Sequence, residues 1–144
     1  MPTLYTLIGL PASGKSTFSI AHPEYVVVSS DEIRAELFGN AEIQKNPRLV
    51  FQTAHKRIEK ALTENKDVIF DATNLTIKDR KGIFNHKNCK HIAIYFNANV
   101  EKCVERDSKR NRIVSANVIR DMAKRLTKPT IEEGFHEIYI KDVD

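Results

Sequence analysis

Gly9-Leu10-Pro11-Ala12-Ser13-Gly14-Lys15-Ser16 is the stretch that decides the fold of this chain of 144 residues. It matches the pattern GxxxxGK[ST], and it follows an apolar run, Thr3–Ile8, that is typical of a buried strand. Two glycines let a backbone turn tightly with its N–H groups pointing inward, and a helix beginning near Lys15 adds the positive end of its dipole. The sequence therefore predicts a strand, a phosphate-binding loop and a helix in that order.

Each polar position of this loop has a chemical use. Lys15 is suited to bridge the β- and γ-phosphates of a nucleotide, and the Ser16 hydroxyl is suited to ligate Mg²⁺. We therefore expect ATP and Mg²⁺ as cofactors. The expected nucleotide-binding residues are Gly9, Pro11, Ala12, Ser13, Gly14, Lys15, Ser16 and Thr17. By itself the loop does not separate a kinase from an ATPase or a nucleotide switch.

Outward from the loop, short apolar runs alternate with helical patterns. Further strands are expected at residues 25–29, 67–70, 91–96 and 135–140. Helices are expected at residues 47–65, 76–86 and 99–110, and Ser115 is expected to cap a last one. This order predicts an α/β fold of the P-loop kinase-like type, with a five-stranded parallel sheet between two helical layers. We expect one domain over residues 1–144, with a lid at about 106–128.

Polar residues follow the strand expected at 25–29, in the stretch Ser29-Ser30-Asp31-Glu32-Ile33-Arg34. In a parallel sheet, ligands bind beyond the carboxyl ends of the strands. A hydroxyl acceptor is a weak nucleophile, and Asp31 at this place would orient it and take its proton. Arg34 shares a helical face with Asp31 and could hold an acceptor phosphate bidentately. The alternative is that Asp31 only caps the helix and Arg34 is a surface charge.

Asp71 closes the strand expected at 67–70. An apolar run that ends in Asp resembles a Walker B strand, whose carboxylate reaches magnesium, often through water. We therefore expect Asp71 to be catalytic and, together with Ser16, to bind the metal. An Asx turn that merely closes the strand is the alternative, because Thr73 and Asn74 suit such a turn.

Arg106 and Arg110 lie four residues apart in the helix expected at 99–110, and so on one face of it. Two arginines over the nucleotide could neutralise charge on the transferring phosphoryl group and close the site against water. Residues 101–128 hold nine Lys or Arg against four acids, an excess of +5, whereas the whole chain carries +4. This suggests an anionic partner. A solvated helical face is the alternative, and it better fits Arg112, Arg120, Lys124 and Arg125.

The composition excludes several other classes of protein. Hydrophobic residues make up 41% and charged residues 29%, which is ordinary for a globular chain. Cys89 and Cys103 have no metal-binding spacing. No apolar run approaches the length of a membrane span and no leader pattern is evident, so we expect a cytoplasmic protein without a membrane partner.

Together the motifs GLPASGKST, SSDEIRAELFG, DATN, RDSKR and EGFHEI resemble the polynucleotide 5′-hydroxyl kinase family of phage and bacterial nucleic-acid repair. The resemblance runs from Gly9 to Ile140. It implies an ATP-dependent kinase acting on a nucleic-acid 5′ end. It also implies a role for each matching residue: Lys15 and Ser16 for phosphates and magnesium, Asp31 as general base, Arg34 on the acceptor's phosphate, Asp71 as a required acid, and Arg106 and Arg110 on the lid. The DxDGT phosphatase motif often fused to such kinases does not occur in this sequence.

Two other functions remain open at this point. A small-molecule kinase for a nucleoside, sugar or antibiotic hydroxyl would use the same catalytic residues. A non-enzymatic ATP-binding or switch module would not need Asp31 or the paired arginines. Aromatic residues make up only 8% of the chain and Trp is absent, so a nucleic acid would be contacted at one or two terminal nucleotides.

Overall fold

Five parallel strands form the centre of the computed structural model, which describes residues 1–40, 46–110 and 114–143. The strands are β1 (Thr3–Ile8), β2 (Val26–Ser29), β3 (Val68–Asp71), β4 (Lys90–Ala98) and β5 (Glu137–Val143). They pair in the order β2-β3-β1-β4-β5. This topology places the strand of the predicted phosphate loop in the middle of the sheet and confirms the predicted α/β fold.

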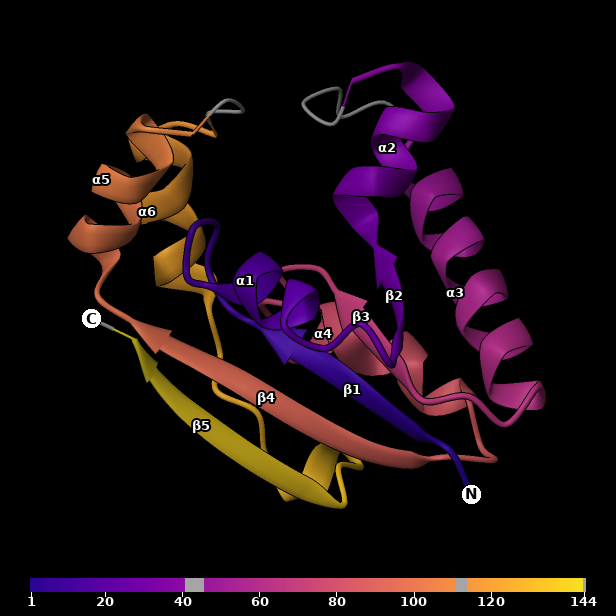
Figure 1. Ribbon diagram of the computed structural model, residues 1–144. Helices are drawn as coiled ribbons and strands as arrows, with labels where there is room; N and C mark the ends of the chain where they lie inside the picture. The colour runs from indigo at the N-terminus through magenta and orange to yellow at the C-terminus, as the bar shows by residue number, and fades with distance from the viewer. Residues whose placement is uncertain (41–45, 111–113, 144) are drawn as a thin grey trace.

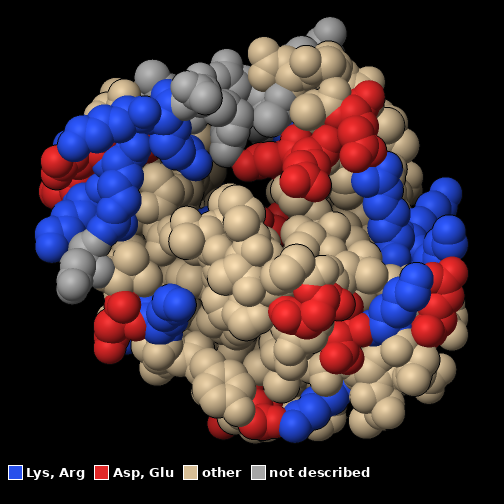
Figure 2. All heavy atoms as spheres, viewed as in Figure 1, with Lys and Arg blue, Asp and Glu red and all other residues tan. Residues whose placement is uncertain are grey.

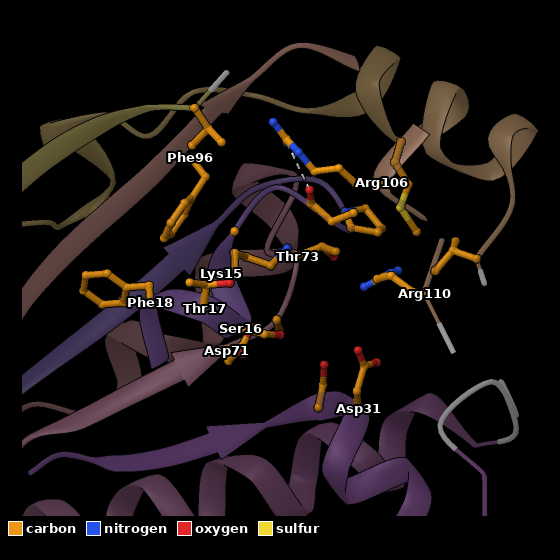
Figure 3. A pocket seen from close by; sticks show the side chains of 18 of the residues that line it. Lys15, Ser16, Thr17, Phe18, Asp31, Asp71, Thr73, Phe96, Arg106 and Arg110 are labelled. Atoms are coloured by element: carbon orange, nitrogen blue, oxygen red, sulfur yellow. Dashed lines mark hydrogen bonds between the residues drawn. The ribbon is translucent and has the colours of Figure 1, made fainter. Parts of the chain in front are cut away.

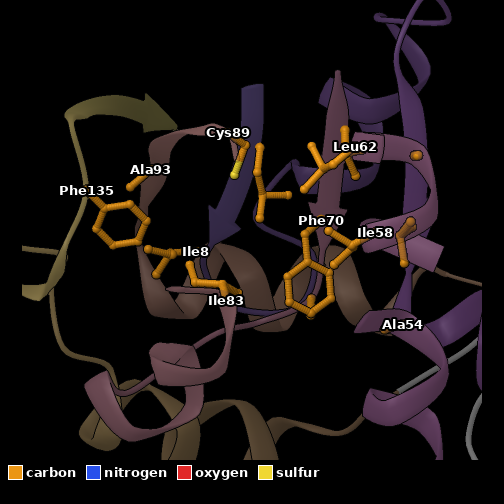
Figure 4. Close-up of a cluster of buried hydrophobic side chains, with 14 of the residues drawn as sticks. Ile8, Ala54, Ile58, Leu62, Phe70, Ile83, Cys89, Ala93 and Phe135 are labelled. Carbon is orange, nitrogen blue, oxygen red and sulfur yellow. The ribbon is translucent and has the colours of Figure 1, made fainter. Parts of the chain in front are cut away.

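Side chains that alternate along the strands build a core on each face of the sheet. Leu4, Val28 and Phe70 face the first core, which packs on the amphipathic helix α3 (Pro47–Thr63) and on Ile83. Figure 4 shows Ala54, Ile58 and Leu62 of α3 pointing toward Phe70. Leu7, Ile69, Ile94 and Phe96 face the second core, where Phe18 of the short helix α1 (Lys15–Ile20) packs. The two helical layers are therefore unequal in size.

Three of the remaining helices lie beyond the carboxyl ends of the strands, and the shorter ones lie elsewhere around the sheet. Helix α2 (Ser30–Phe38) follows β2 directly, and α4 (Ile77–Arg80) and the 3₁₀ helix η1 (Lys81–Asn85) follow β3. Helices α5 (Val100–Ser108) and α6 (Ala116–Arg125) pack together past the arrowheads of β1 and β4 (Figure 1). A short 3₁₀ helix, η2 (Ile131–Glu133), precedes β5. No helix of the described segments is long and apolar enough to cross a bilayer.

Some predicted element bounds are wrong for identifiable reasons. Phe135 was expected to begin the last strand, but it is buried against Phe84 in the loop before β5. The helix expected at 76–86 is a single α-turn followed by η1. Ser115 occupies the N-cap position of α6 without a side-chain cap, because its φ is +113°. Phe135 and Ser115 thus lie next to the strand and the helix that they helped to predict, but outside them.

Candidate active site

The phosphate loop needs glycine at two positions for two different reasons. A Cβ on Gly9 would lie 2.8 Å from Ser13 Oγ and 3.0 Å from Phe96 Cβ, so the close packing of the loop on β4 excludes a side chain. Gly14 has a φ of +104°, in the left-handed region that favours glycine. Ala12 is also left-handed, with a φ of +60°, a conformation that is rare for a residue with a Cβ. The strand, loop and helix predicted around residues 9–16 are therefore all present.

Lys15 is buried under this loop. Its Nζ donates to the carbonyl oxygens of Leu10 at 2.7 Å and Gly9 at 3.0 Å. Burial lowers its pKa to about 8, against the opposing effect of Asp71 and Asp31, whose negative charges raise it. The ammonium group is thus anchored by local carbonyls while two carboxylates stand nearby.

The hydrogen-bond donors of the loop suit the phosphate groups of a nucleotide. The Ser13 hydroxyl is buried and has no hydrogen-bond partner, so a polar group remains to be satisfied inside the loop. The hydroxyl groups of Ser16 and Thr17 line the cavity beside Lys15. Within the described part of the chain no group of three or more His, Cys, Asp or Glu side chains could hold a metal. A cation at Ser16 and Asp71 would therefore take its other ligands from phosphate and water.

Asp71 lies at the end of β3, opposite Ser29 of β2 in the sheet register. Burial raises the pKa of its carboxyl group, while Lys15 lowers it, Asp31 raises it and the Ser19 hydroxyl, 3.4 Å from Oδ2, lowers it. Thr73 sits just beyond, and its carbonyl accepts from Gly9 N at 3.1 Å. The Walker B-like position predicted for Asp71 is thus beside the phosphate loop.

Asp31 and Arg34 form a pair on the first turn of α2. Ser29 begins this helix by accepting a hydrogen bond from Glu32 N, so Asp31 itself does not provide the cap. Arg34 Nη1 donates to Asp31 Oδ1 at 2.9 Å, and its guanidinium lies 5.9 Å from the ring centre of Phe51. The Asp31 side chain is 44% exposed and that of Arg34 is 13% exposed. Both residues line the cavity, and Figure 3 shows Asp31 on the wall opposite Arg106.

Arg106 and Arg110 both line the cavity, but they do not share a helix. Helix α5 ends at Ser108, so the prediction of a helix through Arg110 is wrong. Arg106 Nη1 donates to the carbonyl of Ala12 at 3.4 Å, which links the lid to the phosphate loop (Figure 3). Arg110 donates to Asp107 Oδ1 at 2.5 Å. Residues 111–113 of the expected lid at 106–128, Arg112 among them, lie outside the described residues.

Asp107 explains why the chain leaves the helix at this place. Its buried carboxylate accepts hydrogen bonds from Val114 N and Ser115 N, at 3.1 and 3.0 Å, as well as from Arg110. Burial opposes the ionised form, but the bonds from Ser115, Arg110 and Val114 outweigh it, and the pKa of Asp107 is lowered. A single carboxylate thus ties the end of α5 to the start of α6.

The predicted catalytic residues Lys15, Asp31, Arg34, Asp71, Arg106 and Arg110 all line one cavity of about 980 Å³. Figure 3 shows Asp31, Asp71, Lys15 and Arg110 directed into it from different elements. Sequence analysis missed most of its apolar lining, which includes Phe18, Phe51, Phe96, Val114, Val118 and Met122. Val118 and Met122 recur at helical spacing in the helix that was expected after Ser115, a pattern that by itself indicates only a packed face. Their position beyond the sheet edge, where a ligand is expected, is the signal that could have identified them.

A second feature escaped the sequence analysis. Arg80 is fully buried, and its Nε and Nη2 donate to both carboxylate oxygens of Glu133 at 2.9 Å. Its Nη1 donates to the carbonyls of Asn74, Leu75 and Thr127. This network ties the loop after β3 to the segment that follows α6. Glu133 belongs to the EGFHEI stretch, which carried no assigned role.

The basic excess of residues 101–128 is partly neutralised on the surface. Arg120 pairs with Glu101, Lys109 with Glu105 and Arg125 with Asp121. Figure 2 shows Lys and Arg gathered over the lid helices, with acidic side chains on the α2 side of a hollow between them. These pairs favour the solvated-face interpretation for Arg120 and Arg125.

Comparison with known proteins agrees with this geometry. A family model described as an AAA domain (AAA_33) matches residues 4–129. Among solved structures, a chain of the Pnkp1/Rnl/Hen1 RNA repair complex matches with a TM-score of 0.78 and 23% identity, over 87% of this chain and 44% of its own length. The present chain thus spans less than half of that protein.

Two small-molecule kinases match over a larger share of their own length. A gluconokinase from Sinorhizobium meliloti 1021 has a TM-score of 0.64 and 18% identity, covering 99% of this chain and 83% of that one. A sugar kinase from Janibacter sp. HTCC2649 has a TM-score of 0.73 and 14% identity, covering 99% and 86%. At such identities the likeness shows a shared fold.

Proposed function

The chain belongs to the AAA domain family AAA_33, and we propose that it is an ATP-dependent kinase that phosphorylates the 5′-hydroxyl end of DNA or RNA. One observation carries the proposal: a phosphate loop, an acid on the opposite wall and two arginines from a separate lid line the same cavity. A module that only bound a nucleotide would need the loop, but not an acid and arginines turned toward it.

Lys15, Ser16 and the loop backbone would hold the phosphates of ATP, and Ser16 with Asp71 would hold Mg²⁺. The bound nucleotide and metal supply the phosphoryl group and the positive charge that stabilises its transfer. Lys15 adds a second positive charge from below the loop. Because burial already lowers its pKa to about 8, a phosphate is a better partner for its ammonium group than the carbonyls of Gly9 and Leu10.

Asp31 would act as the general base. Its carboxylate accepts the proton of the acceptor hydroxyl as that oxygen bonds to the γ-phosphorus and the bond to the bridging oxygen breaks. Arg34 fixes the carboxylate at Oδ1 and is only 13% exposed, so it can orient both Asp31 and a phosphate on the acceptor. Arg106 and Arg110 stabilise the charge on the transferring group from the other side.

The choice of a nucleic-acid end rests on a smaller set of features. Support comes from the resemblance of the Asp31/Arg34 and Arg106/Arg110 pairs to polynucleotide 5′-hydroxyl kinases and from the fold shared with the RNA repair chain. Arg34 beside Phe51 offers a cation and an aromatic face, which suit a nucleotide phosphate and its base.

A small-molecule kinase is the second candidate. It is favoured by the gluconokinase and sugar kinase structures, which share their fold with nearly the whole chain. A cavity of about 980 Å³ has room for a nucleotide together with a sugar-sized acceptor.

The deciding experiment is a transfer assay with γ-labelled ATP. We expect DNA or RNA oligonucleotides with 5′-hydroxyl ends to be labelled in the presence of Mg²⁺. Asp31→Asn should lower kcat by about 10²- to 10⁴-fold while ATP still binds. Glu32→Gln, one residue away on the exposed side of α2, is the matched control and should behave as the wild type.

Two results would contradict the proposal. Labelling of a sugar or nucleoside panel with none of any DNA or RNA end would favour the second candidate. An Asp31→Asn variant that loses ATP affinity in proportion to kcat would remove Asp31 from the role of base.

A further inference from the structure

A second cavity, of about 720 Å³, lies between α3 and the 3₁₀ helix η1. Phe51 lines both this cavity and the active-site cavity, so the two meet at its ring. From there Phe51, His55 and Glu59 follow one another at intervals of four residues along one face of α3. The opposite wall comes from Gly82, Asn85 and His86. We call this cavity the α3 groove.

The rim of the α3 groove carries two cations. Arg48 and Lys56 are exposed on α3, and neither forms an ion pair with any residue of the described segments. The one carboxylate of the groove, Glu59, accepts a hydrogen bond from His86 Nδ1 at 2.6 Å. The positive charges of the rim therefore remain available to an anionic ligand, whereas the negative charge is already engaged.

Flat rings line the floor of the groove. His55 and His86 stack with their centroids 5.2 Å apart, and His55 Nδ1 lies 3.0 Å from His86 Nε2. Burial lowers the pKa of His55, and His86 lowers it further, which favours the neutral form of the His55 ring. Gly82 lies against this ring from the opposite wall, since a Cβ there would be in van der Waals contact with His55 Nε2, at 3.4 Å. Flat rings beside cations that have no ion-pair partner in the described part of the chain suit a ligand in which bases and phosphates alternate.

The groove also begins at the proposed acceptor end. The Arg34 guanidinium lies over the Phe51 ring at 5.9 Å and is hydrogen-bonded to Asp31. An acceptor whose hydroxyl meets Asp31 would therefore leave the active-site cavity past Arg34 and Phe51. A sugar or nucleoside would end there, and only a longer, repeatedly charged acceptor would reach Lys56.

We propose that the α3 groove binds the single-stranded nucleic acid that trails behind the phosphorylated 5′ end. Arg48 and Lys56 contact its phosphates, and Phe51 and His55 contact its bases. This inference rests on the proposed function and deepens it, since it makes the preferred acceptor a strand of several nucleotides. It replaces the expectation, drawn from the few aromatic residues, that only one or two terminal nucleotides are contacted.

The test compares acceptors of different length. For the wild type we expect kcat/KM to be at least about tenfold higher for a 5′-hydroxyl octanucleotide than for a nucleoside 3′-monophosphate. Lys56→Glu should lower the ratio of kcat/KM for the octanucleotide to kcat/KM for the monophosphate by about tenfold. Arg48→Ala should also lower this ratio. Lys60→Glu is the matched control: it places the same charge change one turn along α3, outside the groove, and should leave the ratio unchanged.

Binding of a fluorescent octanucleotide, followed by anisotropy without ATP, separates this inference from the proposed function. Its salt dependence should become shallower by about 0.7 in log–log slope for each phosphate contact removed. Weaker binding by Lys56→Glu than by Lys60→Glu would support the groove even if transfer to both acceptors failed, a failure that would instead reject the proposed function. Equal kcat/KM for both acceptors, or equal effects of Lys56→Glu and Lys60→Glu on binding, would overturn the inference.

Discussion

Lys15 of the phosphate loop and Arg106 and Arg110 of the lid line the same cavity, yet they are held in different ways. Lys15 is buried and bound to carbonyls five and six residues before it in the chain. Arg106 reaches across 94 residues to Ala12, at 3.4 Å, and Arg110 depends on the carboxylate of Asp107. Lys15 is thus held by carbonyls of its own loop, whereas Arg106 depends on a contact that only the folded chain creates.

This difference separates binding from catalysis. A loop that holds its lysine in place without the lid can bind phosphates when the lid is damaged. Arg106 makes one long hydrogen bond to the loop, and Leu10 of the loop also packs in one buried cluster with Cys103 of α5 and Ile119 of α6, so replacing the lid arginines leaves these apolar contacts in place. We therefore expect changes in the lid to lower turnover more than nucleotide affinity.

The largest expected effect comes from removing both lid arginines. The double variant Arg106→Ala/Arg110→Ala should lose about 10³-fold or more in kcat. The reason is that two positive charges no longer stabilise the negative charge on the transferring phosphoryl group. The dissociation constant for ATP, measured by calorimetry, should change far less. The variant Lys102→Ala/Lys109→Ala removes the same charge from exposed positions of the lid region and serves as the control.

An equal loss of ATP affinity and turnover in the arginine variant would break the comparison, because the lid would then be part of the nucleotide site. Unchanged turnover would assign both arginines to the surface.

A smaller effect is expected at Asp107. Asp107→Asn keeps the size of the side chain but replaces one acceptor oxygen by a donor that faces Val114 N and Ser115 N. Arg110 and the start of α6 should lose their positions, and kcat should fall by about tenfold with little change in ATP affinity. The stability of the protein should also fall, by about 1–3 kcal/mol in denaturant titration. Glu105→Gln, an exposed acid two residues away, is the control.

We expect Asp107 to act by holding Arg110 in position, so Asp107→Asn must change the contribution of Arg110 to kcat as well as the stability of the protein. We expect the arginine double variant and Asp107→Asn to be non-additive in kcat, because both act through Arg110. Full additivity would show that Asp107 only stabilises the fold.

The same contrast explains which features could be predicted from the sequence. Thr3–Ile8, residues 9–16 and the apolar face of α3 follow from local spacing, and the structure confirms them. Residues around Asp31 and Asp71 were expected at strand ends, and the adjacent parallel strands β2 and β3 bring them together. These features depend on the spacing of apolar residues and on the order of elements along the chain, both of which can be read from the sequence.

Other features depend on partners that are remote in sequence. Asp107 was read only as one acid within a basic helix, because its three hydrogen-bond donors come from the following turn. Arg80 and Glu133 are 53 residues apart, and neither position has a local pattern that predicts a buried ion pair. A charged residue is normally exposed, so sequence patterns give no reason to bury these two.

The smallest expected effect sharpens the account of Lys15 itself. Its pKa in the folded protein, about 8, lies below the ordinary lysine value of 10.5, so between these values the unfolded chain binds more protons than the folded one. The stability of the ligand-free protein should therefore rise with pH through this window, and Lys15 should contribute about 1 kcal/mol of the rise between pH 7 and pH 9. Lys15→Met should lack that contribution, so the difference in unfolding free energy between wild type and variant should shift by this amount.

Lys66 is an exposed lysine, and Lys66→Met should leave the pH dependence between pH 7 and pH 9 unchanged. A wild-type curve parallel to that of Lys15→Met would mean that the carbonyls of Gly9 and Leu10 fully compensate the buried charge, and the loop would then hold its lysine without cost before any phosphate arrives.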